Sequence, residues 1–134
     1  MDGWKVIEEN RFLIPSLPPS VNAIYQIIFS QRRVEMKPEV RAWKNNAKLY
    51  VPTMKAMDDS YLFRLDATFH YDFFFKNGKI RKFDTHNMMK VLCDAVAEKA
   101  GFRDELVKFG SWSSIHNTEK EQVEIVVSQV KPEP

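Results

Sequence analysis

Hydrophobic and polar residues alternate along most of Tyr61–Phe75, which is the clearest pattern in the chain. The apolar positions are Phe63, Leu65, Ala67, Phe69, Tyr71, Phe73 and Phe75. Because successive residues of a strand point to opposite faces, this pattern predicts a long strand with one buried face. Lys76–Gly78 then forms a turn signal, since Gly78 can adopt the positive φ that such a turn often needs.

Two other segments have the spacing of helices. From Pro38, the first apolar stripe contains Val40, Trp43, Ala47 and Tyr50, and Pro52 ends or kinks this helix. His86–Lys99 carries the second stripe, formed by Met88, Val91, Leu92, Ala95 and Val96. Gly101 follows this second helix as a C-terminal cap.

Shorter apolar runs predict strands at Arg11–Ile14, Leu106–Trp112 and Val123–Val130, while the segment SVNAIYQ is expected to be a loop or turn. The resulting order is β, α, β, α, β, β. It predicts an α+β fold, with a mixed, largely antiparallel β-sheet flanked by two α-helices.

Composition narrows the class of protein. A chain of 134 residues that is 44% hydrophobic can form one domain with its own core, so we expect a single domain over 1–134. A net charge of +2 permits a nucleic-acid partner without requiring one. Cys93 is the single cysteine, and we expect a buried free thiol in a reducing cytoplasm. No stretch has the apolar length of a membrane span, so we expect no membrane partner.

The segment 79–107 contains the residues best suited to catalysis. Cutting a phosphodiester requires an activated water and charge stabilisation, which divalent cations held by carboxylates supply. Asp84 precedes the second helix and Asp104 follows it, and we expect the fold to bring them together as Mg²⁺ ligands. His86, two residues after Asp84, would join them if the segment is extended, and it would favour Mn²⁺. The alternative is that His86 only begins the helix.

Basic residues surround these acids. Lys90 can stabilise charge at the scissile phosphate, or it can form a surface pair with Asp94, four residues later, that contributes only about 0.3–0.5 kcal/mol. The loop before Asp84 can bind a phosphate backbone, although such clusters are also common in solvated turns. Its cations are Lys76, Lys79, Arg81 and Lys82.

Three segments resemble the RusA family of Holliday-junction resolvases, and the similarity extends over nearly the whole chain. LPPSVNAIY is similar to the family's proline-proline-serine-x-asparagine segment. FDTHNMMKVLCDAV resembles its aspartate, asparagine, lysine and aspartate pattern, and AGFRDELV resembles the segment with the last catalytic aspartate.

The resemblance implies a role for each matching residue. Asp84 and Asp104 correspond to metal-binding aspartates, Lys90 to the catalytic lysine, and Asn87 and Asp94 to the family's asparagine and helix aspartate. We assign Asn87 to the DNA-binding set together with the four cations of the loop.

This sequence departs from the family pattern in its acidic residues. His86 stands where the family has its middle aspartate, which removes one negative charge from the metal site. The family's acidic doublet is here Arg103–Asp104, followed by Glu105, which would be the ligand if the alignment shifts by one residue.

The resemblance also implies a homodimer that makes paired symmetric nicks in four-way DNA junctions with Mg²⁺ or Mn²⁺ and without an organic cofactor, in recombination and repair. Such proteins are often encoded by phages and prophages. Two rival hypotheses are a branched-DNA-binding protein with a weakened metal site, and a nuclease of the same fold that acts on other branched or flap DNA.

Overall fold

A computed structural model describes residues 3–20, 24–54 and 61–134. Its main element is a four-stranded sheet with the order β1-β6-β4-β5. The strands are β1 (Trp4–Ile14), β4 (Leu62–Tyr71), β5 (Val107–His116) and β6 (Gln122–Pro132). β6 is antiparallel to both of its neighbours, and β4 and β5 are parallel. The sheet is therefore mixed and largely antiparallel, as the sequence predicted.

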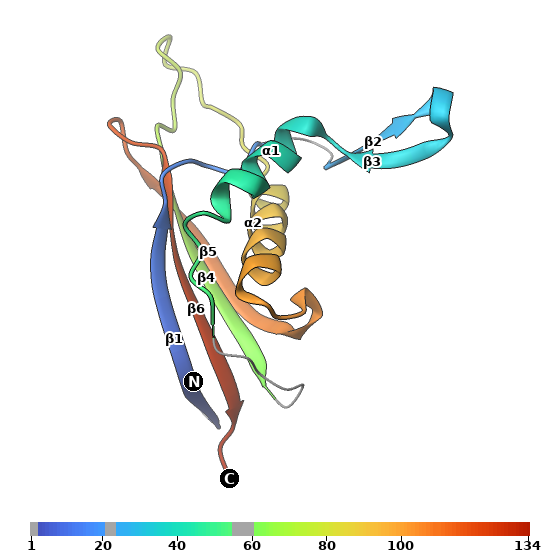
Figure 1. The fold of residues 1–134 in the computed structure, drawn as a ribbon. Helices are drawn as coiled ribbons and strands as arrows, with labels where there is room; N and C mark the ends of the chain where they lie inside the picture. Colours follow the sequence, from blue (N-terminus) through green and yellow to red (C-terminus); the bar gives the residue numbers. More distant parts are fainter. Residues whose placement is uncertain (1–2, 21–23, 55–60) are drawn as a thin grey trace.

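Both helices, α1 (Pro38–Ala47) and α2 (Thr85–Ala100), pack on the same face of this sheet (Figure 1). The predicted apolar stripe of α2 is fully buried, and so are the inward side chains of β4 as far as Tyr71. The α+β prediction is confirmed, and one core lies between the sheet and the helices.

The connection from β4 through α2 to β5 sets the geometry of the site. Because β5 is parallel to β4, α2 must run back along the sheet, and its N-terminus lies at the carboxyl end of β4. The chain then turns through a short 3-10 helix, η2 (Asp104–Leu106), into β5. The rings of Phe63 and Phe102 stack with their centroids 3.9 Å apart and hold this lower turn against β4.

Two glycine predictions are confirmed. Gly101 ends α2 with φ of 92°, and its N–H donates to the carbonyl of Ala97. Gly78 has φ of 84° in the turn after β4, and its N–H donates to the carbonyl of Phe75. Both turns thus use a backbone conformation that other residues adopt only at a cost.

The ends of several elements differ from prediction. β1 begins at Trp4, well before Arg11, because it pairs with β6 along nearly its whole length. β4 ends at Tyr71 instead of Phe75, since the Asp72 carboxylate accepts a hydrogen bond from the N–H of Phe74 and turns the chain.

A two-stranded hairpin was not predicted. β2 (Tyr25–Ile28) and β3 (Arg33–Met36) pair antiparallel around the 3-10 turn η1 (Phe29–Gln31) and project from the body (Figure 1). The expected loop SVNAIYQ is therefore wrong at Tyr25–Gln26, and its residues 21–23 lie outside the described part of the chain. Four-residue strands are too short to show a period clearly.

Across the described ranges, no helix is long and apolar enough to cross a membrane.

Candidate active site

Asp84 begins α2. Its carboxylate accepts hydrogen bonds from the backbone N–H of Asn87 at 3.0 Å and from the Asn87 side-chain amide at 3.3 Å. This is an N-cap, which satisfies a backbone donor that the helix leaves unpaired. The Asp84 N–H in turn donates to Ser20 Oγ at 2.8 Å, which ties the start of α2 to the proline-rich segment near the N-terminus.

A hollow of about 360 Å³ opens beside this cap. It is lined by Ser20, Lys82, Phe83, Asp84, Thr85 and His86. His86 therefore shares a cavity with Asp84, although not for the expected reason. The helix begins at Thr85, so His86 lies in the first helical turn and not in an extended segment. Its ring stands edge-on to Trp112 of β5, with the centroids 6.1 Å apart.

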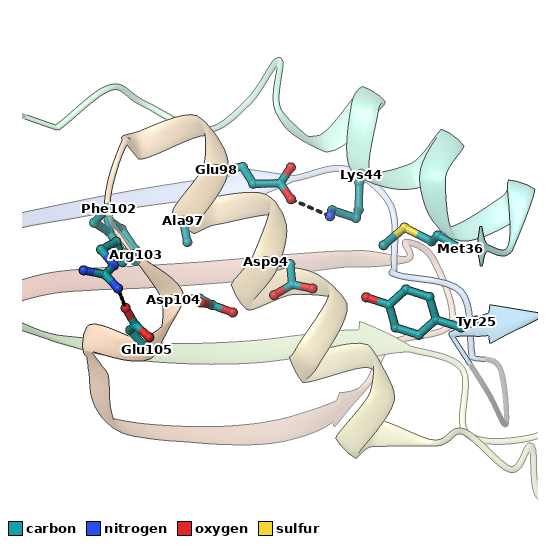
Figure 2. A pocket seen from close by; sticks show the side chains of 10 residues that line it. All are labelled: Tyr25, Met36, Lys44, Asp94, Ala97, Glu98, Phe102, Arg103, Asp104 and Glu105. Atoms are coloured by element: carbon teal, nitrogen blue, oxygen red, sulfur yellow. Dashed lines mark hydrogen bonds and ion pairs between the residues drawn. The ribbon is translucent and has the colours of Figure 1, made fainter. Parts of the chain in front are cut away.

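Asp104 lies in a different cavity, which has a volume of about 400 Å³. Figure 2 shows its carboxyl group beside that of Asp94, near the middle of α2, with the Tyr25 hydroxyl pointing toward the same space. The two carboxyl groups are close enough for each to affect the charge of the other. Burial is the main cause that raises the pKa of Asp94, and the Asp104 carboxyl adds to it while the charge of Lys44 opposes it.

Lys44 of α1 is a buried cation that lines this cavity. Its side chain is 8% exposed, and Nζ lies 2.8 Å from Glu98 Oε1 (Figure 2). Burial disfavours the charged form of Glu98, but hydrogen bonds from Lys44 and Lys48 outweigh it and hold the pKa of Glu98 below its usual value. Glu105 also lines this cavity, and it forms an ion pair there with Arg103.

The expected metal ligands are thus divided between two cavities. Asp84 and Asp94 are ten residues apart along one helix, which corresponds to roughly 15 Å at 1.5 Å per residue. Asp104 accompanies Asp94 and does not line the hollow of Asp84. Within the described residues, no group of three or more His, Cys, Asp or Glu side chains is placed to hold a metal ion.

Lys90 lies between the two cavities. It is exposed on α2, four residues from His86 and from Asp94, and it forms no ion pair or hydrogen bond through its side chain with any described residue. The predicted alternative, a surface pair with Asp94, is therefore not formed. Its ammonium group can approach a phosphate without first breaking a protein contact.

The cations of the basic loop also differ in whether they contact other residues. Arg81 is held by the structure, since Nη1 donates to the Asp72 carbonyl at 3.1 Å and Nη2 contacts Glu121 at 2.9 Å. The three lysines of the loop are exposed, and their side chains have no described partner. They are Lys76, Lys79 and Lys82.

Sequence reasoning missed Lys44, although the chain contains a signal. Val40, Lys44 and Ala47 fall at the spacing of one helix face, so a lysine stands inside an apolar stripe. A lysine is rarely buried there without a carboxylate partner. That partner, Glu98, lies 54 residues away and follows from no local pattern.

Comparison with known proteins gives the family. The family model for Endodeoxyribonuclease RusA matches residues 16–128 of the 134-residue chain, which includes both cavities, the basic loop and Lys90. No curated protein matches the chain. The match covers most of the chain, so the protein belongs to the RusA family of endodeoxyribonucleases, which act on Holliday junctions.

Proposed function

We propose that the protein is a divalent-cation-dependent endonuclease that resolves four-way DNA junctions by paired symmetric nicks, as a cytoplasmic homodimer. The observation that carries the proposal is the exposed side of α2. Acidic groups stand at its N-terminus and near its middle, and Lys90 lies between them without a partner among the described residues. This arrangement can bind a cation and a phosphate on one surface.

The donor atoms of the second cavity fit Mg²⁺ or Mn²⁺. Mg²⁺ is commonly held by one or two carboxylates and keeps several waters, and Asp94 and Asp104 present two adjacent carboxyl groups. A bound cation would neutralise charge on the phosphate and lower the pKa of a water that attacks it. Lys90 would hold the phosphate, and the lysines of the loop would bind the flanking backbone.

In a homodimer, Asp84 of one chain can share a site with Asp104 of the other chain. Two symmetric nicks require two equivalent sites, and a twofold axis provides them. In one chain Asp84 is separated from Asp104, but a twofold-related chain can place its own Asp104 near Asp84. Mixing Asp84→Asn with Asp104→Asn protein tests this, because only a site shared between chains is restored in a mixed dimer.

Cleavage of a synthetic mobile four-way junction tests the proposed function. Wild-type protein with Mg²⁺ or Mn²⁺ should make paired nicks, and chelator should abolish them. Asp104→Asn should lower the rate by roughly 100-fold or more, while Glu119→Gln, an exposed acid outside both cavities, should leave it unchanged. Equal cleavage of three-way and flap DNA at the same salt concentration would favour a broader nuclease.

A second candidate function is junction binding without cleavage. It is favoured by His86 in place of the family's aspartate and by the division of the acids into two cavities in one chain. Tight binding with no nicks in either metal, and nicking gained in His86→Asp, would support this function over the first.

A further inference from the structure

A third cavity lies beside the loop that follows β4, and Phe83 packs on two of its lining residues, Tyr71 and Arg81. Its volume is about 440 Å³, and most of its lining is aromatic or aliphatic. The lining residues are Tyr71, Phe73, Phe74, Ile80, Arg81 and Ser114. Its polar side-chain groups are the hydroxyls of Tyr71 and Ser114 and the guanidinium of Arg81. A mostly apolar cavity with a few convergent polar groups is the usual form of a site for a small planar ligand.

Contacts within the protein join the walls of this cavity. Phe74 and Ile80 form an isolated β-bridge across the loop that follows β4. The backbone N–H of Phe73 donates to His116 Nδ1 at 3.0 Å, and the Tyr71 hydroxyl contacts Ser114 Oγ at 3.4 Å. These contacts join the loop to β5, so the cavity requires little ordering when a ligand enters.

Arg81 forms the polar wall. Its guanidinium lies 4.7 Å from the centroid of the Phe83 ring, and its contacts with Glu121 and the Asp72 carbonyl hold it in place. A planar guanidinium offers hydrogen-bond donors to the edge of a heterocycle and can also stack on its face.

Phe83 connects this cavity to the candidate active site. Its ring packs on Tyr71 with the centroids 4.4 Å apart, and the same residue lines the hollow that contains Asp84 and His86. A group bound against Tyr71 would therefore be linked through one aromatic ring to the hollow of Asp84, the acid at the start of α2. A base in this cavity and the neighbouring phosphate of the same strand in the hollow of Asp84 would need such an arrangement.

The positive charge around the cavity is suited to binding a negatively charged nucleic-acid backbone. Lys76 and Lys79 lie on the loop that forms its outer wall, and Lys82 borders the hollow of Asp84. None of their side chains has a partner among the described residues. Cations without carboxylate partners beside aromatic walls are the features by which proteins bind an unpaired strand, with the backbone held by charge and the base by stacking.

We propose that this cavity receives one unstacked nucleobase from the branch point of the bound DNA. The proposal rests on the proposed function, since it assumes that the chain binds branched DNA. Bases at a branch point are the least costly to extrude, because their stacking is already interrupted. The captured base would fix which phosphate reaches the acids of α2.

The test uses four-way junctions with the fluorescent base 2-aminopurine either at the branch point or inside an arm. Wild-type protein should raise the fluorescence of the branch-point probe, because an unstacked 2-aminopurine is less quenched, and should leave the arm probe unchanged. Phe74→Ala should weaken junction binding by roughly tenfold, which is within the range for loss of one stacked base. Phe74→Trp should retain junction binding and the change in branch-point fluorescence.

Controls separate loss of the stacked base from misfolding, from the loss of any aromatic ring and from the loss of a phosphate contact. Phe74 and Ile80 are 45% and 66% exposed, so their alanine variants should fold, which circular dichroism checks. Phe29→Ala removes an aromatic ring that is 82% exposed on the distant hairpin, and it should change neither signal. Lys79→Ala should weaken binding to junctions and to plain duplex alike, because it removes a phosphate contact.

Junction binding with an unchanged branch-point signal would overturn the base-capture proposal, and so would wild-type affinity in Phe74→Ala. Both results would leave the proposed function intact. Failure of the wild-type protein to bind any branched DNA would instead overturn the proposed function and this proposal with it.

Discussion

Asp84 combines two roles that a pair of substitutions can separate. Its carboxylate caps α2 through the N–H and the side-chain amide of Asn87, and it lines the hollow next to the basic loop. Asp84→Ala removes the cap and should lower the free energy of unfolding by about 1 kcal/mol. Asp84→Asn keeps an oxygen at the same position, and asparagine caps as well as aspartate, so its stability should change by only a few tenths of a kcal/mol.

Urea unfolding and junction cleavage together measure the two roles. With a slope of about 1–3 kcal/mol per molar urea, the Asp84→Ala midpoint should fall by about 0.3–1 M, and that of Asp84→Asn should stay close to wild type. Both variants should lose nicking, since neither supplies the charge. Wild-type cleavage by Asp84→Asn would show that Asp84 is only a cap. A large loss of stability in Asp84→Asn would refute the capping account.

Three further predictions follow from single contacts. Gly110→Ala should lower stability by about 1–3 kcal/mol in a thermal melt, because its Cβ would lie 2.6 Å from the backbone oxygen of Leu65; unchanged stability would mean that β5 can shift. Burial, with the nearby charges of Asp94 and Asp104, raises the pKa of the Cys93 thiol to about 11. Iodoacetamide should therefore modify the native protein much more slowly than the unfolded one at pH 8, and the native rate should rise with pH up to about that value; equal rates would contradict the burial. Lys90→Gln should lower nicking by roughly 100-fold with stability unchanged within about 0.5 kcal/mol, whereas Lys108→Gln, another exposed lysine, should alter neither.

The local elements of the fold could be predicted from the sequence. The alternation after Tyr61 predicted the buried face of β4, and the stripe from Met88 to Val96 predicted the face of α2 that packs on the sheet. Gly101 ended that helix within one residue of prediction. These features are set by interactions between residues that are close in the chain, where the period of burial reports the local conformation directly.

The hairpin of β2 and β3 was not accessible in this way. Each strand has four residues, and its pairing, Tyr25 with Met36 and Ile27 with Val34, depends on the partner strand and not on its own period. The same limit applies to Lys44 and Glu98, since the helices that carry them meet only when both cover the same face of the sheet.

By itself, the sequence determined the class of the fold and the position of α2, and it predicted the acidic and basic residues around that helix as candidates for catalysis. Only the tertiary structure decided how those residues are grouped, with Asp84 beside His86 and Asp104 beside Asp94. The reason is physical: a parallel pair of strands forces the connecting helix to run the length of the sheet. The acids before and after that helix are therefore held apart within one chain, however close their motif places them in the sequence.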